Sequence, residues 1–304
     1  HKGAIFVMGK KYRVGLIGVG SIAHIAHLPI LAARNDVEMV GAFAKHIESV
    51  EKTQKSYAIQ HAVHNLDELL SLDLDCAFVL SPKTVHAEQV IRLLEAGVDV
   101  FCEKPMGMTL KEAYDMADAS ARTGKKLMIA FNRRYAPVYR KAKEVYGQLS
   151  PDVLIAQKNR PASEYRATLE NAIHMVDILR YFCGECVKVE ACSKFTDPLY
   201  ETLATAQLQF ENGSVAMLVA DRASGQWVET LEMHGHNKSV LVNCPDTITI
   251  TDGQQSHTTS MTPLAYGWAK VIDKMGFTQE VDHFFDCLSN DKEPLTSGAD
   301  AYKT

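Results

Sequence analysis

The sequence of 304 residues contains no apolar run that approaches the roughly 20 residues needed to cross a membrane. It also lacks a signal peptide with a charged start, an apolar middle and a small-residue cleavage site. An excess of basic charge is missing too, since 37 acidic residues outnumber 32 lysines and arginines and the formal net charge is -5. We therefore expect neither nucleic acid nor an anionic membrane as a partner.

Cysteine is scarce and unpatterned, with seven residues scattered along the chain. An odd number in a chain of this size indicates reduced thiols rather than a disulfide framework, and hence a cytoplasmic protein. The hydrophobic content of 46% and charged content of 23% are those of a soluble globular protein. A chain of 304 residues is too long for one ordinary core, so two domains are expected.

A glycine-rich turn stands near the start of the chain. The run Arg13–Ile17 predicts a buried strand, and Ser21–Arg34 predicts a helix that Pro29 would end or kink. Between them lies Gly18-x-Gly20-x-x-Ala23, a pattern that brings backbone amides close to a pyrophosphate at a helix N-terminus. The predicted dinucleotide site therefore includes Gly18, Gly20, Ser21, Ile22 and Ala23.

The second predicted strand, Val37–Phe43, bears on the choice of cofactor. Proteins that select NAD usually place an acidic residue about 20 residues after the glycines, on the ribose 2′-hydroxyl. Here the chain reads Ala44-Lys45-His46, so an acid is missing and a cation is present. We predict NADP as the cofactor, with NAD possible if Lys45 is merely solvated.

Strands and helices alternate through residue 131. Further strands are predicted at 75–80, 98–102 and 126–131, and helices at 48–57, 67–70, 86–96 and 109–123. This alternation predicts an α/β fold whose first domain, residues 8–131, is a doubly wound parallel Rossmann sheet with right-handed crossovers.

The pattern changes after residue 131. Helices are predicted at 137–146, 169–182 and 279–288, and strands at 153–158 and in the alternating runs between 187 and 251. Asn212-Gly213 marks a hairpin. The second domain, residues 132–304, is therefore predicted to be α+β, with a large, mostly antiparallel open sheet covered by helices on one face. Apolar residues on the other face, such as Met217 and Val219, predict a homodimer or homotetramer.

The placed motifs resemble those of the glucose–fructose oxidoreductase / inositol dehydrogenase (Gfo/Idh/MocA) family, over nearly all of residues 11–304. The resemblance is carried by the glycine turn, Ser81-Pro82 with His86, Glu103-Lys104-Pro105, Asn171-Ala172-Ile173-His174, and Glu293-Pro294-Leu295. It implies hydride transfer between NAD(P)(H) and a secondary hydroxyl or keto group of a sugar, polyol or derivative. It also extends the predicted cofactor site to Ser81, Pro82, His86 and Glu103.

The resemblance assigns catalytic roles to Lys104 and His174. Lys104 follows a predicted strand at the carboxyl edge of the parallel sheet, where its ammonium can stabilise charge on a reacting oxygen. His174 would handle the proton, and the family usually has Asp one turn earlier, where this chain has Asn171. Asn171 can orient a hydroxyl but cannot raise the basicity of His174 through charge. The resemblance also implies that the chain stops short of a last segment that returns to the first domain.

Each assignment has a structural alternative. Lys104 could lie in a surface turn, Glu103 in a salt bridge, and His174 in the core. Arg133, Arg134 and Tyr135, at the domain junction, could contact substrate or form ion pairs. No metal site is expected, because Cys183-x-x-Cys186 has no partner pair and His234-x-His236 lies in a strand-and-turn context. Tyr139-x-x-x-Lys143 matches a short-chain dehydrogenase pair, but the glycine spacing of that family is absent.

Two other functions remain open at the level of sequence. A non-catalytic cofactor-binding regulator could use the same fold, and the substitution at Asn171 favours it. An NAD-dependent glycoside hydrolase is a further possibility within the resemblance.

Overall fold

A computed structural model describes residues 11–162, 164–197, 200–261 and 270–304. The chain forms two compact units. The first comprises the chain up to Ala130 together with Val281–Lys303, and the second comprises Phe131–Glu280 together with Thr304. The observed division at residue 130 lies beside the predicted one at 131.

The C-terminal part of the chain differs from the prediction, which placed all of 132–304 in the second domain. Helix α9 (Phe277–Ser289) crosses from the second unit to the first, where Phe284 packs edge-to-face on Phe78 with centroids 5.7 Å apart. Aromatic burial therefore holds residues 281–303 in the first unit. Residues 281–303 thus return to the first unit.

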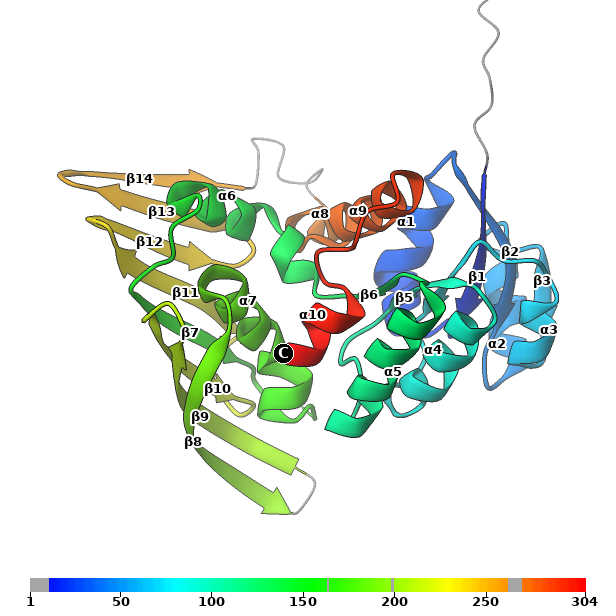
Figure 1. Cartoon of the computed structure of the whole chain (residues 1–304), viewed down its shortest axis with the longest axis horizontal. Coiled ribbons are helices and arrows are strands. Elements are labelled where there is room, and N and C mark those ends of the chain that lie inside the picture. The colour runs from blue at the N-terminus through cyan, green and yellow to red at the C-terminus, as the bar shows by residue number, and fades with distance from the viewer. Residues whose placement is uncertain (1–10, 163, 198–199, 262–269) are drawn as a thin grey trace, which may run out of the picture. The chain divides into compact units, whose positions relative to one another are not determined.

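The first unit is built on a parallel sheet of six strands in the order β3-β2-β1-β4-β5-β6 (Figure 1). The order reverses direction between β1 and β4, which confirms the predicted doubly wound Rossmann sheet. Its strands are β1 (Tyr12–Ile17), β2 (Val37–Phe43), β3 (His61–Val63), β4 (Cys76–Val79), β5 (Asp99–Cys102) and β6 (Leu127–Ile129).

Helices of the first unit connect these strands, apart from α10, which comes last in the chain and packs on α5 and β6. They are η1 (Ala23–His27), α1 (Leu28–Ala32), α2 (Ile47–Gln54), α3 (Leu66–Leu70), η2 (Lys83–Val85), α4 (His86–Glu95), α5 (Leu110–Thr123) and α10 (Gly298–Lys303). Gly124 ends α5 in the left-handed region with φ 66°, a conformation that glycine adopts without strain. The helix after the glycine turn contains a π-helical stretch, η1, directly before Pro29, which occupies the first turn of α1. The helix type thus changes from π to α at Leu28, within the segment where the proline predicted an end or a kink.

The second unit is built on an eight-stranded sheet in the order β14-β13-β12-β11-β7-β10-β9-β8 (Figure 1). All its pairs are antiparallel except β7 with β10, as predicted for a mostly antiparallel sheet. The strands are β7 (Val153–Asn159), β8 (Cys186–Asp197), β9 (Tyr200–Phe210), β10 (Val215–Asp221), β11 (Val228–Gly235), β12 (Lys238–Asn243), β13 (Thr247–Asp252) and β14 (Gln255–Ser260).

One face of this sheet forms the core of the second unit. Alternate residues such as Leu154, Leu218 and Leu231 are buried in one hydrophobic cluster with α6 (Pro137–Tyr146) and α7 (Ile173–Cys183). The remaining helices are η3 (Asn132–Tyr135), η4 (Ala167–Ala172) and α8 (Val271–Lys274). On the opposite face Met217 is 54% exposed, as the sequence predicted for an open face.

Candidate active site

The glycine turn at the end of β1 has the backbone geometry that a dinucleotide requires. Gly18 has φ +91°, and a Cβ atom there would lie 2.7 Å from the backbone carbon of Leu80. Only glycine fits this position. At Gly20 a Cβ atom would meet nothing within 4 Å, so the space above the helix start is open. That space and the first amides of the helix from Ser21 fit a pyrophosphate.

The other residues of the turn behave as the pattern predicts. Ser21 is exposed and Ile22 is half-buried, whereas Ala23 is fully buried. A larger side chain at Ala23 would separate the helix from the sheet, so its small size serves packing.

A second loop of the site follows β4, next to Gly18. Ser81 is half-buried and its hydroxyl donates to Gln89 over 2.5 Å, while Pro82 is exposed. His86 is only 1% exposed. Its Nε2 lies 2.9 Å from the carbonyl oxygen of Ser81, and its Nδ1 lies 3.0 Å from that of Pro105. The predicted cofactor residue His86 therefore ties two loops of the sheet edge together with its ring.

Lys104 lies on the second of these loops, directly after β5. It is half-buried, and its backbone amide donates to Glu103 over 3.1 Å. Glu103 itself is buried and accepts from His27 Nε2 at 2.8 Å. Burial alone would raise the pKa of Glu103, but the hydrogen bond and charge of His27, with the charge of Lys104, lower it. Glu103 thus remains a carboxylate behind Lys104, in the salt bridge that the sequence left as an alternative.

The end of β2 carries no acid. Phe43, the last residue of β2, is followed by Ala44 and then by Lys45, whose side chain is exposed. Among the described residues no hydrogen bond or ion pair engages Lys45. A cation therefore stands where an NAD-selective protein would have a carboxylate.

His174 and Asn171 lie in the second unit, at the junction of η4 and α7. His174 is 6% exposed and stands edge-to-face with Phe131, at a centroid distance of 6.4 Å. The amide nitrogen of Asn171 donates to the carbonyl oxygen of Lys158 over 3.1 Å. The side-chain oxygen of Asn171 is buried and has no hydrogen-bond partner among the described residues. It is thus a buried acceptor whose hydrogen-bonding capacity is unused within those residues.

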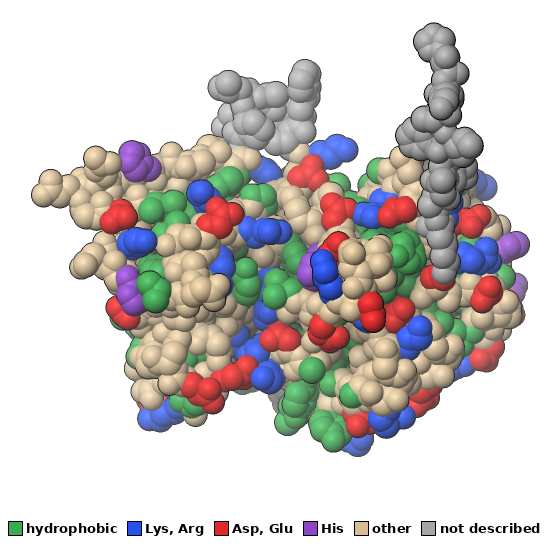
Figure 2. Space-filling view, turned by 45° about the horizontal axis from the view of Figure 1, so that its top comes forward, with side chains coloured by type: hydrophobic (Ala, Val, Ile, Leu, Met, Phe, Trp, Pro, Cys, Tyr) green, Lys and Arg blue, Asp and Glu red, His purple; other side chains and the backbone are tan. Residues whose placement is uncertain are grey.

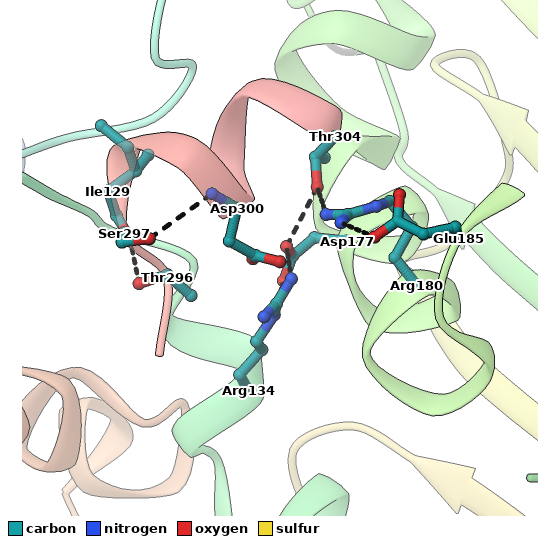
Figure 3. A network of polar contacts seen from close by, with 9 residues as sticks. All are labelled: Ile129, Arg134, Asp177, Arg180, Glu185, Thr296, Ser297, Asp300 and Thr304. Carbon is teal, nitrogen blue, oxygen red and sulfur yellow. Dashed lines mark hydrogen bonds and ion pairs between the residues drawn. The ribbon is translucent and has the colours of Figure 1, made fainter. Parts of the chain in front are cut away.

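Asp177, three residues after His174 on α7, forms an ion pair with Arg134. Both its oxygens accept from Arg134, at 2.8 and 2.6 Å, and the pair is buried. Figure 3 shows this pair extended within the second unit, where Thr304 donates to Asp177 and accepts from Arg180. In the first unit the same view shows the hydroxyl of Thr296 donating to the carbonyl oxygen of Ile129.

Arg133 belongs to a different buried cluster. It forms a two-pronged pair with Glu229, at 2.6 and 2.9 Å, and Lys158 also donates to Glu229. Burial and the charge of Arg133 lower the pKa of Lys158 to about 7, although Glu229 opposes this. Burial alone would raise the pKa of Glu229, but Arg133 and Lys158 outweigh it and the pKa falls. The sequence analysis did not identify Lys158 and Glu229 as members of a buried cluster. Of the two alternatives that it gave for Arg133 and Arg134, substrate contact or ion pairs, the structure shows ion pairs.

Tyr139 and Lys143, the pair spaced as in short-chain dehydrogenases, both make contacts within the second unit. Tyr139 is fully buried, while Lys143 donates to the carbonyl oxygen of Tyr181. All seven cysteines are free thiols. Within residues 11–162, 164–197, 200–261 and 270–304, no cluster of three or more His, Cys, Asp or Glu could hold a metal ion. Over the same residues, none of the helices is both long and apolar enough to cross a membrane. Figure 2 shows acidic and basic side chains interspersed on the face in view.

Comparison with known proteins identifies the class. Residues 12–131 match the model of an oxidoreductase family with an NAD-binding Rossmann fold, and residues 140–241 match the GFO/IDH/MocA C-terminal domain. The chain belongs to this family of oxidoreductases, which confirms the resemblance.

Individual relatives are dehydrogenases. The chain is 25% identical over 320 residues to D-apiose dehydrogenase of Paraburkholderia graminis, covering 97% of this chain and 85% of the relative. It is 23% identical to the NAD+-dependent scyllo-inositol 2-dehydrogenase of Bacillus subtilis, over 75% of this chain and 71% of the relative. The crystal structure of the dehydrogenase MviM from Clostridium difficile superposes with a TM-score of 0.87 at 26% identity, covering 97% of this chain and 96% of that one.

Proposed function

We propose that the protein is an NAD(P)-dependent dehydrogenase or reductase that acts on a secondary hydroxyl or keto group of a sugar, polyol or derivative. One observation in the first unit carries the proposal. His86 joins the Ser81 loop to Pro105, which places the loop of Lys104 beside the loop that packs on Gly18. Lys104 and the glycine turn thus lie at one sheet edge, which supports a role for Lys104 beside the cofactor. D-apiose dehydrogenase and scyllo-inositol 2-dehydrogenase act on a sugar and a polyol by name, which supports the substrate class.

The cofactor would be held by Gly18, Gly20, Ser21 and Ile22 at its pyrophosphate, with Ser81 and Pro82 alongside. When bound, the nicotinamide supplies or accepts the hydride. We propose a preference for NADP because Lys45 is exposed and unengaged at the end of β2. Calorimetric titration with both cofactors tests it: Lys45→Ala is expected to lose about 1.5–3 kcal/mol of NADP affinity. Tighter binding of NAD by the unaltered protein would contradict the preference.

Lys104 would stabilise negative charge on the substrate oxygen, and His174 would transfer the proton at that oxygen. Asn171 would orient the substrate through its buried acceptor oxygen, which meets no partner within the described residues. Lys104→Ala should lower turnover by about 10²–10³ while leaving cofactor affinity unchanged. His174→Ala should lower it by about 10²–10⁴ and flatten the pH dependence near neutrality. Asn171→Ala should be milder.

Single-turnover oxidation of NADPH by an accepted keto-sugar measures these effects. Near-wild-type rates in both Lys104→Ala and His174→Ala would refute the mechanism. A regulator would bind NADPH but never oxidise it, and Lys104→Ala would change only ligand binding. A glycoside hydrolase would release sugar from a glycoside without net change in its NAD.

The second unit supplies the surface for the proposed homodimer or homotetramer. Met217, Leu203 and Leu241 are 54%, 36% and 37% exposed, and their strand registers place them on the face opposite the core. Burying such apolar side chains favours association. Light scattering at micromolar concentration should therefore give a mass above that of one 33.7 kDa chain.

The seven free thiols support our proposal that the protein works in a reducing compartment such as the cytoplasm.

A further inference from the structure

A pocket of the second unit lies where β7 ends and β11 begins. It has a volume of about 380 Å³ and is lined by Arg160, Pro161, Glu164, Tyr165 and Trp227. Arg160 directly follows β7, and Trp227 directly precedes β11. The two strands pair antiparallel, which brings these two residues to the same end of the sheet. The volume lies within the range of pockets that bind small molecules.

Aromatic rings and the backbone hold Arg160 in place. Its guanidinium carbon lies 4.0 Å from the centroid of the Trp227 ring and 5.5 Å from that of Tyr165. Its backbone amide donates to Asp221 over 2.8 Å, and its carbonyl accepts from Ser224 over 3.1 Å. A stacked guanidinium with a fixed backbone is preorganised to make two parallel hydrogen bonds to an anion.

Arg160 lacks the partner that the neighbouring arginines have. Its Nε is buried and meets no hydrogen-bond acceptor among the described residues, and no carboxylate there forms an ion pair with it. Arg133, by contrast, is paired with both oxygens of Glu229. A buried donor without an acceptor is costly, so a ligand that supplies acceptors at Arg160 gains that energy.

The surrounding charge also favours an anion. Glu229 is shared between Arg133 and Lys158, so it is already engaged by two cations. Glu164, the carboxylate that lines the pocket, is exposed to solvent, where its attraction for Arg160 is weak. Burial and the charge of Arg133 lower the pKa of Arg160 although the charge of Glu229 opposes them, and the charge of a bound anion would favour the protonated guanidinium.

The pocket adjoins the proposed catalytic face within the second unit. Trp227 contacts Arg160 and also lies 5.7 Å from the ammonium of Lys158. The carbonyl of Lys158 accepts from Asn171, one turn before His174. We propose that the pocket binds an anionic group of the substrate, a carboxylate or a phosphate, in a two-pronged pair with Arg160. This rests on the proposed function, and it narrows the substrate class to acidic or phosphorylated sugars and polyols.

The test compares matched neutral and anionic probes. Calorimetry with the cofactor-loaded protein would measure D-gluconate against D-glucitol, and glucose 6-phosphate against glucose. The preferred anionic probe should bind more tightly than its neutral partner, and Arg160→Gln should weaken its binding by about 10- to 100-fold. Binding of the neutral probes should not change. A stronger effect within the gluconate pair identifies a carboxylate, and within the phosphate pair a phosphate.

Two further variants make the test specific. Arg160→Lys keeps the charge without the planar fork, so it should restore part of the lost affinity even if Arg160→Gln folds poorly. Lys141→Gln removes an exposed charge on α6 of the same unit and should leave binding unchanged. Equal binding of the paired probes, no detectable binding of either anion, or no effect of Arg160→Gln would overturn the proposal.

Turnover separates this inference from the proposed function. Arg160-dependent binding of an anion without any NAD(P)-linked turnover would support the pocket and refute the dehydrogenase. Turnover of neutral sugars that is indifferent to Arg160→Gln would support the dehydrogenase and refute the pocket.

Discussion

The two sheets of the molecule bury different kinds of groups. In the first unit the six parallel strands carry an apolar core, and the buried carboxylate of Glu103 meets one imidazole at the sheet edge. In the second unit the covered face of the eight-stranded sheet includes Lys158 and Glu229, both fully buried at their side chains. The first unit thus shapes its glycine turn through the backbone, whereas the second unit buries a cluster of paired charges. Backbone features tolerate change in neighbouring charges, and buried ion clusters do not.

The largest expected effect tests this contrast directly. Glu229→Gln should lower the free energy of unfolding by about 3–5 kcal/mol, because it leaves Arg133 and Lys158 without a counter-charge. Glu103→Gln in the first unit should cost only about 1–3 kcal/mol. Urea denaturation measures both, with the exposed Glu144→Gln as a control expected to change stability by less than about 0.5 kcal/mol. Equal losses of unfolding free energy in Glu103→Gln and Glu229→Gln would contradict the contrast between the two units.

Substitutions of Gly18 and Gly20 test whether the backbone of the first unit shapes the glycine turn. Gly18→Ala should destabilise the protein by about 1–3 kcal/mol, because its Cβ would strike Leu80 and its φ of +91° is strained for alanine. Gly20→Ala has open space and should leave stability within about 0.5 kcal/mol of the unaltered protein. It should nevertheless weaken cofactor binding at least about tenfold, as the methyl group occupies the phosphate space. Unchanged affinity in Gly20→Ala would place the pyrophosphate elsewhere.

The smallest effect is a pH dependence from Lys158. The native pKa of about 7 lies below the ordinary lysine value of about 10.4. Between these values the unfolded chain binds more protons than the native protein, so stability rises with pH. Relative to Lys158→Met, the unaltered protein should gain about 1 kcal/mol between about pH 7.5 and 8.5. Chemical denaturation at the two pH values measures it, and parallel behaviour of both proteins would show that Lys158 keeps its proton.

Sequence reasoning succeeded where the determining interactions are local. The strand from Val37 to Phe43 and the helix from Pro137 to Tyr146 have the predicted bounds, since hydrophobic period and helix-start signals lie within each segment. The turn at Gly18 was predicted for the same reason. The roles of His174, Lys104 and Asn171 remain predictions.

Ion pairs between residues far apart in the sequence could not be predicted. Arg133 and Arg134 are neighbours in sequence, yet their carboxylate partners are Glu229 and Asp177, 96 and 43 residues away. Nothing near the arginines indicates those partners. The position of Lys158 could have been recognised in the sequence, because Lys158 lies on the same face of its strand as the buried Leu154 and Ala156. A lysine at such a position predicts a buried charge and therefore a counter-charge nearby.

The return of residues 281–303 to the first unit has a consequence for synthesis on the ribosome. Phe78 and Phe101 stack with centroids 4.6 Å apart, and Phe284 closes on both rings. Those two rings emerge from the ribosome before Phe131–Glu280 of the second unit, whereas Phe284 emerges after that segment. The first unit to be made is therefore the last to complete its core, and its aromatic surface needs protection from aggregation in the interval.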